Sequence, residues 1–183
     1  MGTTLSANRR LNAYFPDYCE THPRLTEKRI RLVRESWTSV HDGAGAPLKT
    51  HNDTAREQNL PVSSAVVFFY DNFFGSLFEF DSDFHQFFGQ DMEKQGRMLF
   101  NMIGRCIEMV ESHNIKGLKK NLSVLAKRHQ GYGVEAPHYS TVGLALLVGL
   151  SKTLGKELFT DETRDAWIHL YSALMILILP HVI

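Results

Sequence analysis

The sequence predicts an all-α protein. Apolar residues recur at i, i+3 and i+4 over most of the chain, no segment shows the sustained alternation of a β-strand, and capping residues or proline stand where the patterns begin. The chain has 183 residues, of which 43% are apolar and 22% are charged. This size and composition fit one globular domain with a sizeable core.

Residues 1–24 lack helical periodicity and contain Pro16 and Pro23. Proline removes a backbone donor and breaks a helix interior. We therefore expect an irregular N-terminal extension over residues 1–24, followed by a single domain over residues 25–183.

Thr26 is placed to cap the first helix, because its side-chain oxygen can accept from the free amides of the first turn. After this helix, residues 41–61 are polar and contain Gly43 and Pro47. Such a long connection without secondary structure is unusual in a compact domain, and we expect a mobile surface loop there. The apolar face of the first helix consists of Ile30, Val33 and Trp37.

The rest of the chain shows a series of helical patterns joined by short connections. Pro137 suits the first turn of one helix, and Thr160 or Asp161 can cap the last one. We expect helices over about residues 63–80, 91–111, 117–130, 137–155 and 161–179, with a short helical turn at 81–88.

Charge and hydropathy narrow the classes of partner. Twenty basic and twenty acidic residues cancel, so no global field favours nucleic acid. No stretch approaches the ~18 consecutive apolar residues of a membrane span, and no signal peptide is recognisable, which predicts a cytoplasmic protein. The two cysteines, Cys19 and Cys106, stand in unlike contexts, which predicts free thiols.

His129 is the strongest candidate for a functional residue. It lies in the run Leu-Ala-Lys-Arg-His-Gln-Gly-Tyr-Gly-Val at residues 125–134, near the expected end of a helix and between two apolar helices. This arrangement suits a flat apolar cofactor held by one axial imidazole. A second marked segment, Gln-Gly-Arg-Met-Leu, begins at Gln95, 34 residues earlier.

Three segments in order resemble the globin family. Residues 78–88 match a helix-end pattern in which Ser82 replaces the usual proline, residues 90–97 are similar to the start of the distal helix, and the third segment joins the His129 region to the run that begins at Tyr139. The chain resembles bacterial-type single-domain globins, flavohaemoglobin haem domains and the neuroglobin or globin X group. The resemblance implies a globin fold of about seven to eight helices in a three-on-three sandwich, and haem b as the cofactor.

The resemblance also assigns roles around the haem. It makes His129 the axial iron ligand, whose other ring nitrogen needs an acceptor to orient it. It places Gln95 on the distal side, where its amide can donate to a gas ligand that carries partial negative charge. It further implies contacts with the haem from Phe88, which wedges it, from Leu99 on the distal side, from Leu125 on the proximal side, and from Val134 at the rim.

Phe74 aligns with a position that often holds tyrosine in bacterial-type relatives. A tyrosine there donates a hydrogen bond to the gas ligand, and phenylalanine cannot, which removes ~1 kcal/mol of stabilisation and favours faster oxygen release. Tyr70 takes this position instead if four residues are inserted after the helix.

Tyr139 matches a flavohaemoglobin tyrosine that strengthens the proximal histidine together with an acid in the last helix. Residues 178–182 carry no acid here. The resemblance therefore implies that the proximal histidine donates electron density to the iron more weakly, which counts against a specialised NO dioxygenase or peroxidase. The simpler alternative is that Tyr139 is a core tyrosine.

Met1-Gly2-Thr3-Thr4-Leu5-Ser6 satisfies the myristoylation pattern, so Gly2 is a candidate for lipidation. One acyl chain anchors only marginally, and stable attachment needs a second signal. We therefore expect membrane association only if the N-terminus is acylated.

The expected function is reversible binding of oxygen, CO or NO for storage, transport or sensing. One alternative is a redox enzyme or signalling protein that depends on a separate reductase, and another is an adaptor that has lost its haem. The contacts to the haem propionates stay open among Arg97, Lys127 and Arg128. The sequence does not fix the oligomeric state.

Overall fold

The computed structural model describes residues 14–183, which contain helices and no strand. This confirms the all-α prediction for that part of the chain. The elements are α2 (Glu27–His41), α3 (Ala46–Glu57), α4 (Ala65–Phe80), η1 (Ser82–Phe87), α5 (Met92–Glu111), α6 (Ile115–Gly131), α7 (Ala136–Leu158), α8 (Asp161–Ile178) and η2 (Leu179–His181).

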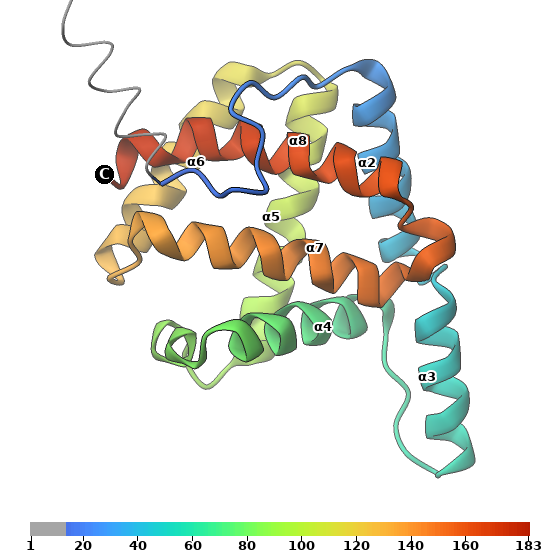
Figure 1. Ribbon diagram of the computed structural model, residues 1–183. Helices are drawn as coiled ribbons and strands as arrows, with labels where there is room; N and C mark the ends of the chain where they lie inside the picture. The colour runs from blue at the N-terminus through green and yellow to red at the C-terminus, as the bar shows by residue number, and fades with distance from the viewer. Residues whose placement is uncertain (1–13) are drawn as a thin grey trace, which may run out of the picture.

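The helices pack in two layers that cross each other. One layer holds α2, α5 and α6, and the other holds α4, α7 and α8. The most extensive packing joins α4 to α7 and α2 to α8, and Figure 1 shows α7 and α8 side by side with α5 crossing them. This is the three-on-three arrangement expected of the globin fold.

Most α-helices begin at a capping side chain, and the caps expected for the first and last helices are formed. The caps accept hydrogen bonds from amides in the first turn, which are otherwise without partners. Thr160, rather than Asp161, caps α8. The five α-helix capping residues with this geometry are Thr26 of α2, Ser64 of α4, Asp91 of α5, Asn114 of α6 and Thr160 of α8.

An aromatic cluster forms the centre of the core between α2 and α8. The Trp37 ring lies 4.6 Å from Phe100 and 6.0 Å from Trp167, measured between ring centroids. The indole of Trp167 donates to Ser36 Oγ at 2.9 Å, so its one polar atom is paired inside the core.

The expected loop over residues 41–61 is wrong, because residues 46–57 form α3. Pro47 starts this helix rather than breaking it, since proline is compatible with the first helical turn. Leu48 and Ala55 are its buried residues. A Cβ at Gly45 would overlap the Thr153 carbonyl oxygen, so the absence of a side chain lets the start of α3 touch the backbone of α7.

The segment around α3 stands outside the main bundle, beyond one end of α7 (Figure 1). It begins at Gly43, whose φ of +65° is in the left-handed region, and a Cβ there would lie 3.3 Å from the Cβ of Ala65. The side chain of Asn52 donates to the Ser63 carbonyl at 3.0 Å and accepts from the Ser63 amide at 2.8 Å, which ties the returning chain to α3.

Residues 14–24 form no helix and lie across α7 and α8 (Figure 1). We call them the N-terminal strap; residues 1–13 lie outside the described part of the chain. Four hydrogen bonds join the strap to the bundle. Tyr18 Oη donates to the Ser140 carbonyl at 2.6 Å, the Glu20 amide to Ser172 Oγ at 2.9 Å, and the Arg24 amide to His169 Nδ1 at 3.1 Å. The Arg29 guanidinium of α2 donates to the Arg24 carbonyl at 3.2 Å.

Candidate functional site

His129 lies in the last turn of α6, half-buried, with an oriented imidazole ring. Its Nδ1 is 2.9 Å from the Leu125 carbonyl oxygen, one turn earlier. A carbonyl can only accept, so Nδ1 carries the proton and the lone pair of a neutral ring is on Nε2. This is the state in which a histidine binds a metal, with the second nitrogen held by a backbone acceptor.

The chain turns sharply after His129 and stays bonded to it. The amides of Tyr132 and Val134 both donate to the His129 carbonyl at 3.0 Å, and Gly133 supplies the left-handed conformation that the turn needs, with a φ of +84°. Val134 is buried directly after this turn. The corner therefore fixes the end of α6 and brings Val134 back next to the histidine.

Tyr139, near the start of α7, is the next polar group on this side. Its ring centroid is 6.4 Å from that of His129, and its side chain is buried. Burial raises the pKa of the phenol to about 12, so it is neutral at physiological pH. Within residues 14–183 its hydroxyl has no hydrogen-bond partner. A buried hydroxyl without a partner costs about 1–3 kcal/mol, which a bound polar group would relieve.

Gln95 lies in the first turns of α5, the helix that packs next to α6 in the same layer. Its side chain is half-buried, as is that of Leu99 one turn later. The neighbouring Gly96 is buried against the Tyr70 ring, which a Cβ at this position would overlap. This close approach of α4 and α5 sets the position from which Gln95 extends.

The structure brings Phe74 and Phe88 together. Their ring centroids are 5.1 Å apart in an edge-to-face arrangement, and Phe88 is half-buried directly after η1. Phe74 also stacks on Phe78 at 5.9 Å. Tyr70 packs against Gly96 instead, one turn before Phe74, so the two candidates for the distal position face different neighbours.

The three basic candidates for a propionate contact differ in their partners. Arg97 is held by Glu93, with bonds of 3.0 Å from Nε and 2.8 Å from Nη2. Lys127 and Arg128 are exposed near the end of α6 and form no ion pair within the described residues. Lys127 and Arg128, next to His129, are therefore the candidates that remain available to bind an anion.

The donor atoms of this region fit a metal ion that is already bound by a cofactor and needs only one ligand from the protein. Residues 14–183 contain no group of three His, Cys, Asp or Glu side chains that could hold a metal ion. A single imidazole with a free Nε2, an unpaired buried phenol and half-buried apolar side chains suit a flat apolar macrocycle. The half-buried apolar residues are Phe88 after η1, Leu99 of α5, Leu125 of α6 and Val142 of α7.

Two contacts that support this region were not anticipated from the sequence. The Tyr171 hydroxyl donates to the Tyr139 carbonyl, so α8 holds the backbone of α7 next to the unpaired phenol. The Tyr18 hydroxyl and the Tyr171 ring lie so close to Gly143 that a Cβ at this position would overlap both. Neither contact has a local signal, because each joins residues far apart in the chain.

The candidate lipidation site Gly2 lies outside the described residues. From Tyr14 to Ile183, none of the helices combines the length and the apolar composition needed to cross a membrane.

Comparison with known proteins gives the family. The Globin family model matches residues 70–176, more than half of the chain. A flavohemoprotein of Xylella fastidiosa (strain 9a5c) is 30% identical over 96 residues, which are 52% of this chain and 24% of that protein. Neuroglobin-1 of Oncorhynchus mykiss is 27% identical over 153 residues, 81% of this chain and 87% of that protein. The chain thus spans about a quarter of the first relative and most of the second, and it belongs to the globin family.

Proposed function

We propose that this globin binds haem b through Nε2 of His129 and binds oxygen or another diatomic gas reversibly for storage, transport or sensing. The observation that carries the proposal is the bond between His129 Nδ1 and the Leu125 carbonyl, because it leaves Nε2 as a free, oriented ligand atom. The haem, held by His129, would supply the iron to which the gas binds.

The chain's own residues define the other side of the site. Gln95 would donate from its amide to the gas ligand, and Leu99 would limit the space next to it. Phe74 packs against Phe88, so this position offers an apolar ring edge and no donor. With one donor in place of two, we expect moderate retention of oxygen and fast release.

Absorbance spectra of the protein with haemin test this proposal. We expect a broad ferrous visible band that splits when carbon monoxide is added, as for iron held by a single histidine. Resolved ferrous bands before carbon monoxide would show a second protein ligand and contradict the role of Gln95. The absence of haem binding would overturn the proposal and favour the adaptor alternative.

Replacing Gln95 by leucine should speed oxygen dissociation about fivefold to tenfold, because the only side-chain donor proposed on the distal side is lost. Stopped-flow measurement of oxygen release checks this. The matched control is Gln58→Leu, which removes an exposed amide at the end of α3. An unchanged rate in Gln95→Leu would show that the amide does not reach the ligand.

A redox enzyme served by a separate reductase is the second candidate. The similarity to a flavohemoprotein favours it, whereas the Tyr139 hydroxyl, which has no partner within the described residues, gives it no support. Rapid NADH-dependent NO consumption in the presence of a reductase would support this candidate over simple binding. Membrane attachment through an acylated Gly2 is compatible with either function, and mass spectrometry of protein from a eukaryotic host tests it.

A further inference from the structure

We infer that the N-terminal strap is a releasable element, held on α8 by the neutral form of His169 and released when that histidine is protonated. The strap turns at residues 16–19, and it is held by the packing of Phe15, Tyr18 and Cys19 against the core and by four hydrogen bonds to the bundle. His169 provides the one contact whose hydrogen-bonding capacity changes with pH.

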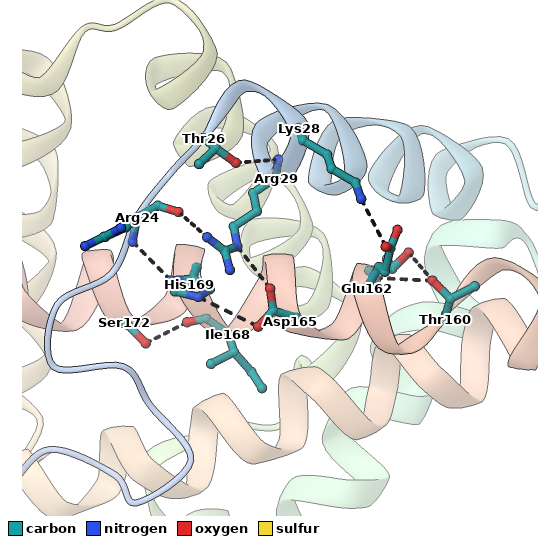
Figure 2. A network of polar contacts seen from close by, with 11 residues as sticks. Arg24, Thr26, Lys28, Arg29, Thr160, Glu162, Asp165, Ile168, His169 and Ser172 are labelled. Carbon is teal, nitrogen blue, oxygen red and sulfur yellow. Dashed lines mark hydrogen bonds and ion pairs between the residues drawn. The ribbon is translucent and has the colours of Figure 1, made fainter.

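The bond at His169 has a defined direction. The Arg24 amide donates to Nδ1 at 3.1 Å, and the side chain of His169 is buried, with 7% of the residue exposed. A backbone amide can only donate, so Nδ1 must be unprotonated while the strap is bound. Figure 2 shows Arg24 and His169 facing each other between the strap and α8.

The charged groups around His169 come from three elements. Nε2 lies 3.7 Å from Asp165 on the same helix, too far for a hydrogen bond. The Asp165 carboxylate is already paired with Arg29 of α2 at 3.0 Å, and Arg29 also donates to the Arg24 carbonyl at 3.2 Å (Figure 2). Lys28 of α2 pairs separately with Glu162. No ion pair joins His169 to α6 or α7 within the described residues.

Protonation of His169 opposes docking of the strap. A proton on Nδ1 would face the Arg24 N–H, so the hydrogen bond is lost and two donors point at each other. The imidazolium would also be buried, whereas in the released state water can solvate it. The neutral ring is therefore favoured when the strap is docked. Docking should therefore weaken on acidification, as the protonated imidazole replaces the neutral ring.

Release of the strap would remove contacts next to His129. Tyr18 donates to the carbonyl of Ser140, which follows Tyr139. At the N-terminal end of the strap, Tyr14 lines a cavity of about 360 Å³ together with Gly133 and Val134, from the corner after His129. The strap thus contacts both chain segments next to the histidine. The effect of strap release on the His129 site rests on the proposed function, whereas the release itself does not depend on haem.

Cys19 reports the state of the strap, because it lies within it and is partly buried. In the full-length chain with Cys106→Ala, Cys19 is the only thiol, and its rate of reaction with 4,4′-dithiodipyridine can be followed from pH 7.5 to 5.5. The rate is divided by that of a peptide of residues 14–24 at each pH, which removes the intrinsic titration of the thiol. We expect this ratio to rise roughly fivefold on acidification, the effect of losing one hydrogen bond.

Two variants assign the effect to His169. His169→Gln keeps an acceptor that does not titrate, so the ratio should stay low and independent of pH. Arg24→Pro removes the donor without altering α8, so the ratio should be high already at pH 7.5. The control His41→Gln changes an exposed histidine paired with Asp42 and should keep the full pH response. A wild-type ratio that does not change with pH, or a normal response in His169→Gln, would overturn the inference, whether or not the protein binds haem.

Discussion

Replacing His129 by glycine should lower haem affinity more than about a hundredfold, since losing a group that merely orients a metal ligand already costs about 10- to 100-fold. The Leu125 carbonyl would remain, but no imidazole would be left in the last turn of α6. Adding free imidazole should restore the spectrum, because a ligand of the same chemistry can occupy the vacated space. Titration with haemin, with and without imidazole, measures both effects.

The control for this experiment is His113→Gly. His113 has a φ of +57°, a conformation that glycine adopts without strain, so the variant removes a histidine at little structural cost. It should bind haem like the wild type. Full haem affinity in His129→Gly would disprove the assignment of the axial ligand, and lost affinity without recovery by imidazole would indicate a collapsed site.

Trp167→Ala should lower the free energy of unfolding by about 3–5 kcal/mol, the range for removing a large buried aromatic side chain. Trp167 is 1% exposed and packs near Trp37, and its indole donates to Ser36. Urea unfolding followed by circular dichroism measures the loss. Trp167→Phe should cost less, because it keeps most of the ring volume.

Tyr132→Ala is the control for the stability experiment. Tyr132 is 69% exposed, so its removal should change the unfolding free energy by less than about 0.5 kcal/mol. A loss in Trp167→Ala as small as that of the control would contradict the central place of the α2–α8 contact in the core.

The helices of the bundle could be predicted from the sequence because local signals and packing agree. Thr26 and Asp91 are capping residues followed by apolar stripes, and both caps are formed in the structure. The helix α3 lacks this agreement: it is polar, and its main supports are non-local. Gly45 touches Thr153, about a hundred residues later, and no periodic pattern reveals such a contact.

The same distinction applies to the candidate site. The bond from His129 to the Leu125 carbonyl spans one helical turn, so a helix over this segment makes it predictable. The contact between Phe74 and Phe88 follows from the short turn that joins them. The strap could not be predicted beyond its irregularity, because Arg24 and His169 are 145 residues apart and neither stands in a recognisable pattern.

The proximity of Gly43 to Ala65 has a consequence for how the chain tolerates change. The backbone leaves the bundle and re-enters it at one place, so residues 44–64 form a closed excursion whose length does not determine where α2 ends or α4 begins. Within it, α3 is fixed by Leu48, Ala55 and the approach of Gly45 to α7, whereas residues 58–64 form no helix. Doubling a flexible loop costs only about 0.6 kcal/mol of closure entropy. The connection at 58–64 is therefore the point at which the protein can gain or exchange sequence while the arrangement around His129 is kept.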